Sequence, residues 1–131
     1  MANKVRVAML SFAHVHAAGY ADQVAKNPDA EIVAVWDEDP VRGKIEAEKR
    51  GVPFVASLNS VLADDGVDAV VVNTPTDLHT KVLLAAAGAR KHIFTEKALT
   101  ITTSDATAVR DAVKASGVCF MISLPSRCRP E

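Results

Sequence analysis

Short apolar runs that alternate with helix-forming segments constrain the fold of this chain more than any other feature of its sequence. The runs are rich in β-branched residues and too short for helices, as Val5–Leu10 and Ile32–Trp36 illustrate. Apolar residues at consecutive positions are typical of strands buried on both faces, as in a parallel sheet. We predict six such strands, the others being Pro53–Val55, Ala69–Val72, Ile93–Phe94 and Val118–Ile122.

The segments between these runs carry the signals of helix starts and ends. Asp39 can cap a helix that has Pro40 at its first position, and Gly51 marks the end of that helix. Similar signals predict further helices over residues 14–26, 57–65, 76–88 and 103–117. Strands that alternate with helices in this way indicate an α/β domain, with helices on both faces of a parallel sheet.

The handedness of the connections limits the order of the strands. Right-handed crossovers leave few topologies for six strands joined by five helices. We expect the doubly wound sheet of dinucleotide-binding domains, with strand order 3-2-1-4-5-6. A five-stranded flavodoxin-like sheet is the alternative that periodicity alone leaves open.

The composition of the chain limits its partners and its compartment. Its 131 residues fit one domain, and 49% hydrophobic residues suffice for a packed core. A formal net charge of -1 gives no general attraction to nucleic acid or to an anionic membrane. No apolar run approaches the roughly 18 residues that span a bilayer. Cys119 and Cys128 make no disulfide framework, so we expect a cytoplasmic protein.

Asp37 is the first candidate ligand for a cofactor, because ligands of such sheets bind at the carboxyl ends of the strands. It follows the second predicted strand, where a carboxylate can accept hydrogen bonds from both hydroxyls of an adenosine ribose. A carboxylate there would repel a 2′-phosphate, which favours NAD over NADP. Alternatively, Asp37 only caps the next turn, although Asp39 already serves as a cap. Arg42 could cover the adenine or pair with Glu38.

The loop after the first strand lacks the glycines of a dinucleotide-binding fingerprint, since no Gly occurs before Gly19. The small side chains of Ser11 and Ala13 still allow the close approach of a pyrophosphate. The helix N-terminus that follows offers free N–H groups, and His14 or His16 could add a donor. The loop therefore remains a candidate cofactor contact through Ser11, Phe12, Ala13 and His14.

The pair of His14 and His16 also suggests a metal site, and with it a metal-dependent hydrolase. A zinc site needs three or four ligands that converge, and the spacing of the histidines and cysteines fits no established zinc pattern. The sequence therefore predicts no metal site. A polar loop with one solvent-facing histidine is the simpler interpretation.

A third group of candidates follows the fourth predicted strand. Asn73, Thr74 and Pro75 would lie beside the first loop, across the switch in strand order. There they could hold the nicotinamide ribose. A plain strand-to-helix turn, capped by Thr76 or Asp77, explains the same residues equally well.

Glu96 and Lys97 follow the next predicted strand. A lysine at the end of a buried strand is unusual for packing alone. Its ammonium could polarise a hydroxyl or carbonyl of a substrate, or take part in proton transfer. A surface ion pair between the two residues is the alternative, and it would contribute little to stability.

Three stretches, in this order and spacing, resemble the glucose–fructose oxidoreductase, inositol dehydrogenase and MocA family (Gfo/Idh/MocA) of NAD(P)-dependent oxidoreductases. They are Val33–Pro40, Val67–His79 and Gly88–Lys97. The family's glycine-rich loop is absent from this chain, and Ala98 stands where the family's Glu-Lys-Pro motif has its proline. That proline fixes the turn that presents the lysine.

The resemblance implies a Rossmann domain and a role for each matching residue. Asp37 corresponds to the adenosine-ribose ligand, Thr74 and Pro75 to the cofactor loop, and His79 lies on the helix after that loop. Lys97 corresponds to the catalytic lysine near the nicotinamide and the substrate, next to Glu96. Leu124–Arg127 matches the stretch that leads into a second domain, where Arg127 would lie near the active site.

The resemblance also implies how the chain is divided and what it does. Residues 1–123 would form the NAD(P)-binding domain, and residues 124–131 would begin the connection to a substrate domain. That second domain would supply most of the substrate pocket and the interface of a homo-oligomer. We expect an oxidoreductase that acts on CH–OH groups of a sugar or polyol, inactive without the second domain. A nucleotide-sensing or protein-interaction module without redox activity is the alternative.

Overall fold

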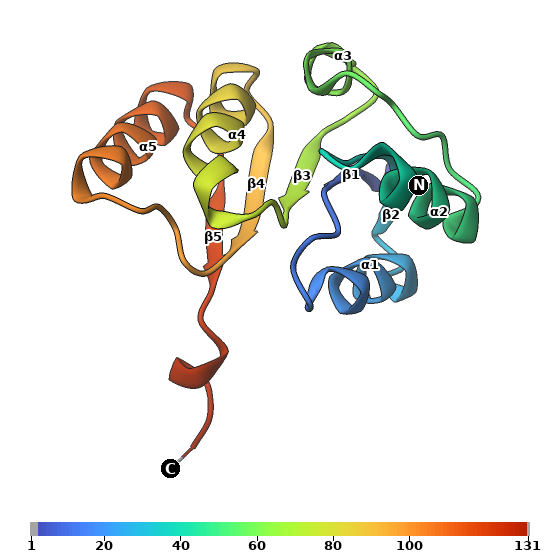
Figure 1. Cartoon of the computed structure of the whole chain (residues 1–131), viewed down its shortest axis with the longest axis horizontal. Coiled ribbons are helices and arrows are strands. Elements are labelled where there is room, and N and C mark those ends of the chain that lie inside the picture. Colours follow the sequence, from blue (N-terminus) through green and yellow to red (C-terminus); the bar gives the residue numbers. More distant parts are fainter. Residues whose placement is uncertain (1–2, 131) are drawn as a thin grey trace.

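A single parallel sheet forms the centre of the domain in the computed structural model, which describes residues 3–130 (Figure 1). Five strands lie within the described residues: β1 (Val5–Leu10), β2 (Ala30–Trp36), β3 (Ala69–Val72), β4 (His92–Glu96) and β5 (Phe120–Ser123). Their order in the sheet is β2-β1-β3-β4-β5, and all neighbouring strands are parallel. The helices are α1 (Ala17–Lys26), α2 (Pro40–Arg50), α3 (Leu58–Ala63), α4 (Thr76–Gly88), α5 (Thr103–Ser116) and the short 3-10 turn η1 (Pro125–Arg127).

The prediction of six strands in the order 3-2-1-4-5-6 is wrong in one element. Residues 53–55 form only an isolated parallel bridge, between Phe54 and Val35 of β2. The segment stays this short because Pro53 has no N–H to pair and because Ser57 already caps α3. The parallel α/β sheet itself is confirmed, and its order is that of the five-stranded alternative.

The ends of α2 lie where the sequence predicts them. The Asp39 side chain accepts hydrogen bonds from two backbone N–H groups of the helix, at 3.0 and 3.2 Å. Gly51 closes the helix with a φ of 64°, a left-handed conformation that glycine adopts without steric cost. In contrast, α1 begins at Ala17 and not at residue 14, because residues 14–16 form a turn.

Apolar side chains cover both faces of the sheet, since alternate residues of a strand point to opposite sides. Helices α3, α4 and α5 pack on one face against a cluster that includes Leu10, Val70, Val72, Leu83 and Val109. Helices α1 and α2 pack on the other face, against Val7, Met9, Ala21, Val35 and Ala47. Figure 1 shows α4 and α5 on the side of the sheet opposite to α1. No helix in residues 3–130 is both long enough and apolar enough to cross a membrane.

Candidate functional site

The loops after β1 and β3 lie side by side at the carboxyl edge of the sheet. His14 N–H donates to Asn73 O at 3.2 Å, and Asn73 N–H donates to Leu10 O at 2.9 Å. The chain leaves β1 toward β2 on one side and returns to β3 on the other, so this point is the switch in strand order. Ligands of doubly wound sheets bind in the crevice at such a point.

The first loop turns sharply without a glycine. Ser11 is fully buried and has a φ of 76°, in the left-handed region that usually favours glycine. Its hydroxyl accepts a hydrogen bond from Ala13 N–H at 3.1 Å, which offsets part of the conformational cost. The loop leads to α1, whose first residue is preceded by His16 without a side-chain cap. Ala17 N–H already donates to His14 O at 3.0 Å, so the N–H groups that remain for an anion are those of the next two residues, Ala18 and Gly19.

Asp37 is buried beneath this loop, and its carboxylate is fully engaged. Oδ2 accepts from Phe12 N–H at 2.9 Å and from Arg42 Nε at 2.9 Å. Oδ1 accepts from Asp39 N–H at 2.8 Å and from Arg42 at 2.6 Å. A carboxylate offers about four acceptor positions, so these four donors fill them. Arg42 thus holds both positions that ribose hydroxyls would need.

Close packing of α2 brings Arg42 to Asp37. A Cβ atom at Gly43 would lie 2.7 Å from Asp37 Cβ and 2.5 Å from a Phe54 ring carbon, so only glycine fits there. The Asp37 hydrogen bonds, with the nearby charge of Glu38, raise the pKa of the Arg42 guanidinium above its ordinary value. The predicted pairing of Arg42 with Glu38 is present, at 2.6 Å.

Asn73 and Thr74 differ from Asp37 because their side chains are buried without partners. Both residues are at most 2% exposed. Within residues 3–130, Asn73 Oδ1, Asn73 Nδ2 and Thr74 Oγ1 have no hydrogen-bond partner. Buried polar atoms in folded proteins are almost always paired, so unpaired ones at a switch point indicate a ligand site. Pro75 is exposed and directly precedes α4.

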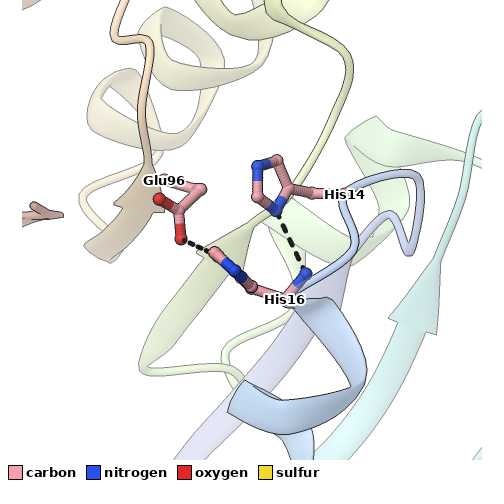
Figure 2. Close-up of side chains that lie close together, drawn as sticks. All are labelled: His14, His16 and Glu96. Carbon is pink, nitrogen blue, oxygen red and sulfur yellow. Dashed lines mark hydrogen bonds and ion pairs between the residues drawn. The ribbon is translucent and has the colours of Figure 1, made fainter. Parts of the chain in front are cut away.

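Glu96 ends β4 with a fully buried carboxylate, and three donors surround it. Figure 2 shows its contact with His16. His16 Nδ1 lies 3.1 Å from Oε2, Lys97 N–H donates to Oε1 at 3.2 Å, and the Tyr20 hydroxyl donates to Oε2. Burial alone would raise the pKa of this carboxyl. The hydrogen bonds from Tyr20 and His16 outweigh burial, so the pKa lies below its ordinary value.

The Lys97 side chain is exposed, and no ion pair joins it to Glu96 among the described residues. His79, which is buried on α4, contacts the loop after Lys97. His79 Nδ1 lies 2.7 Å from Ala98 O and 3.2 Å from Leu99 O. Both oxygens only accept, so Nδ1 carries the hydrogen. His79 thus contacts the loop that follows Lys97.

The carboxyl edge therefore brings together most of the candidates predicted from the sequence. The Ser11–His14 loop, Asp37, Asn73, Thr74 and Glu96 lie at adjacent strand ends. Arg127 lies on η1 and lines a groove with His16 and Tyr20.

Sequence reasoning missed Tyr20 and gave no role to Ser123, although Ser123 follows a predicted strand. A hydrogen bond of 3.0 Å joins Tyr20 Oη to Ser123 Oγ, so both residues belong to the surroundings of Glu96. Burial and the hydrogen bond to Glu96 raise the pKa of Tyr20. The four-residue spacing of His16 and Tyr20 was a usable signal, because it places both side chains on one face of a helix.

Comparisons with known proteins agree with this fold. The scyllo-inositol 2-dehydrogenase (NAD(+)) of Bacillus subtilis is 32% identical over 99% of the chain and 38% of its own length. An NAD-binding protein from Listeria innocua superimposes with a TM-score of 0.83 and 28% identity, over 92% of this chain and 35% of that one. KijD10, a 3-ketoreductase from Actinomadura kijaniata in complex with NADP and TDP-benzene, superimposes with a TM-score of 0.84 and 27% identity. The match covers 92% of this chain and 37% of that one.

The chain spans less than two-fifths of the length of each of these proteins. The family model described as "Oxidoreductase family, NAD-binding Rossmann fold" matches residues 6–124, which is nearly the whole chain. The chain therefore belongs to the Gfo/Idh/MocA oxidoreductase family and comprises its NAD-binding Rossmann domain.

Proposed function

We propose that this domain binds the nicotinamide dinucleotide of an oxidoreductase that acts on CH–OH groups of a sugar or polyol. The observation that carries the proposal is the set of unpaired polar atoms of Asn73 and Thr74 at the switch point. A ribose hydroxyl both donates and accepts, and a pyrophosphate oxygen accepts, so either can pair with atoms of this kind. The relatives named as an inositol dehydrogenase and a 3-ketoreductase support the substrate class.

The residues present fit the cofactor along the whole carboxyl edge. The Ser11–His14 loop and the N–H groups of α1 would hold the pyrophosphate, and Asn73, Thr74 and Pro75 the nicotinamide ribose. The bound nicotinamide would supply or accept a hydride at the substrate carbon. Lys97 would hold a proton at the substrate oxygen, because its side chain is exposed and directly follows Glu96 at the end of β4. Arg127 would contact the substrate or the nicotinamide from η1.

The adenosine end of the site requires a change in the pairing of Arg42. Asp37 can accept the two ribose hydroxyls of NAD only after Arg42 releases its carboxylate, because all four acceptor positions are filled. The released guanidinium could cover the adenine. Asp37 still disfavours a 2′-phosphate, so we propose NAD as the preferred cofactor, with NADP weaker.

The relatives are more than twice as long as this chain, which supports a further domain in the intact enzyme. We propose that residues 1–123 form the cofactor domain and that residues 124–131 begin the connection to a substrate domain. The second domain would complete the substrate pocket and the contacts of a homo-oligomer. The 131-residue chain would bind cofactor without measurable turnover of a polyol.

A second candidate function rests on the loop without glycines. If this loop no longer admits a pyrophosphate, the domain would serve as a nucleotide-sensing or protein-interaction module. This alternative predicts a folded domain that binds neither NADH nor NADPH.

Fluorescence titration of the chain with NADH and with NADPH separates these functions. We expect NADH to bind in the micromolar range and NADPH more weakly. Arg42→Met removes the competing donor from Asp37, so it should tighten NADH binding several-fold. Arg110→Met, on the exposed pair of Arg110 and Asp111, should leave both affinities unchanged. A folded chain that binds neither nucleotide overturns the proposal, and unchanged NADH affinity in Arg42→Met overturns the role of Arg42.

A further inference from the structure

Two histidines of the turn before α1 and a glutamate at the end of β4 converge (Figure 2). His14, His16 and Glu96 each offer one possible metal-ligating atom, and these atoms all lie within 4.8 Å of one another. His16 and Glu96 are 80 residues apart in the chain. The sequence predicted no metal site because the spacing of its histidines and cysteines fits no zinc pattern, whereas the fold adds a carboxylate to the two histidines.

The contact between His16 and Glu96 already has the dimensions of a coordinated pair. Nδ1 and Oε2 are 3.1 Å apart, and Glu96 is an acceptor, so a proton on Nδ1 lies between them. Two donors of a tetrahedral ion with bonds of about 2.0–2.1 Å are separated by about 3.3 Å. A divalent ion can therefore replace this proton with little movement of either side chain.

His14 is positioned to supply the third donor. The donors of a tetrahedral ion are about 3.3 Å apart, and the three ligand atoms lie within 4.8 Å of one another, so the ring needs to move by at most about 1.5 Å. Its Nδ1 accepts a hydrogen bond from His16 N–H at 3.1 Å, which fixes the ring next to His16. The centroids of the two imidazole rings are 4.9 Å apart.

The surroundings of Glu96 favour an ion over an isolated carboxylate. The carboxylate is completely shielded from water, and such a charge is costly unless it is paired. The Tyr20 hydroxyl donates to it and is joined to Ser123, so the carboxylate is held in a fixed orientation. Hydrogen bonds of this kind orient the ligands of metal sites in proteins.

We propose that His14, His16 and Glu96 form a binding site for a divalent transition-metal ion of the zinc class. Two imidazoles and one carboxylate are donors that zinc prefers, whereas magnesium and calcium take oxygen donors. Three protein ligands leave a fourth position for water or for an oxygen of a bound molecule. The site shares His14 with the proposed cofactor loop, but its test uses no nucleotide, so it can fail separately from the proposed function.

Calorimetric titration of the metal-free chain with Zn²⁺ tests the site. Cys119→Ser and Cys128→Ser are introduced together first, because these exposed thiols could bind zinc on their own. We expect about one Zn²⁺ per chain with a dissociation constant in the micromolar range or below. Mutation of a residue that only orients a ligand typically lowers metal affinity about 10–100-fold, and loss of the ligand itself costs more. His16→Gln should therefore weaken Zn²⁺ binding at least about 100-fold. Co²⁺ should give the visible absorption of a tetrahedral nitrogen and oxygen site.

His92→Gln is the matched control, because His92 is exposed on β4 and lies outside the cluster. This variant should bind Zn²⁺ like the parent chain. Glu96→Gln and His14→Gln should lose binding as His16→Gln does. Far-UV circular dichroism checks that each variant folds, and the exposed His16 keeps the test valid if the buried Glu96 variant unfolds. The proposal is overturned if the parent chain binds no Zn²⁺, if His16→Gln binds it unchanged, or if His92→Gln loses it equally.

Discussion

Two halves of the carboxyl edge differ in whether their buried polar groups have hydrogen-bond partners. Beneath the β1 loop, the Asp37 carboxylate accepts four hydrogen bonds, including two from Arg42. One strand further along, Asn73 and Thr74 are equally buried, yet three of their polar atoms have no partner among residues 3–130. The first half is complete within the domain, whereas the second half leaves polar atoms that a ligand would pair under the proposed function.

This difference indicates where folding and binding compete. A fully bonded carboxylate contributes to stability, and a ligand that uses it must first displace a bonded partner. Unpaired polar atoms reduce stability in the free domain, and a ligand that pairs them recovers that loss on binding. Substitutions in the two halves should therefore change stability in opposite directions.

Asp37→Ala should produce the largest loss of stability. It leaves two backbone N–H groups and the Arg42 guanidinium without their acceptor in a buried place. We expect the free energy of unfolding to fall by about 3 kcal/mol, near the low end for a broken buried pair, because Arg42 is one-third exposed and can reach water. Urea unfolding measures the loss. Asp111→Ala, in an exposed pair, should change stability by less than about 0.5 kcal/mol, and equal losses in both variants would contradict the comparison.

Thr74→Val should raise stability, in contrast to Asp37→Ala, and the change should be smaller. The substitution keeps the shape of the side chain and removes a buried hydroxyl that has no partner. We expect the free energy of unfolding to rise by about 1 kcal/mol, while NADH binding weakens. Thermal unfolding and NADH titration of the same sample measure the two effects.

Thr95→Val is the matched control for Thr74→Val. Thr95 is equally buried at the neighbouring strand end, but its hydroxyl donates to Val72 O at 3.0 Å. Removal of this bonded hydroxyl should lower the free energy of unfolding by about 1 kcal/mol. The same shift in both variants would show that the unpaired state of Thr74 has no energetic consequence.

Local signals in the sequence were sufficient to predict the parts of this fold that depend on neighbouring residues. The cap at Asp39, the left-handed Gly51 and the strand ends at Asp37 and Asn73 are all set within a few residues. The sixth strand failed because the apolar run Pro53–Val55 was given more weight than two signals beside it, the missing donor of Pro53 and the helix cap at Ser57.

The candidate site depended more on tertiary contacts, and less of it could be predicted. The sequence identified Asp37 and Arg42 but not that Arg42 fills the acceptor positions of Asp37, because this depends on how closely Gly43 lets α2 approach. It identified Glu96 but not Tyr20, which reaches Glu96 across 76 residues. Contacts of this kind follow from the register of strands and helices, which local patterns do not contain.

A third aspartate separates the effect of burial from the effect of pairing. Asp68 binds Arg6 through three hydrogen bonds, from the backbone N–H at 2.8 Å, Nε at 3.0 Å and a terminal nitrogen at 2.8 Å. This pair resembles that of Asp37 and Arg42, but both side chains are more than one-third exposed, at 42% for Arg6 and 36% for Asp68. Water competes for such groups, so exposed pairs contribute little.

Arg6→Met should therefore cause the smallest change, below that of Thr95→Val. The Arg6 hydrogen bond lowers the pKa of Asp68 to about 2, against about 3.9 for an unfolded chain. The small contribution of the pair is thus complete above about pH 4 and is lost as the pH falls toward about 2. Urea unfolding should show a difference in the free energy of unfolding between parent and variant that narrows as the pH falls from about 4 toward about 2, and that narrows with added salt. A loss as large as that of Asp37→Ala would mean that pairing, and not burial, sets the stability of these aspartates.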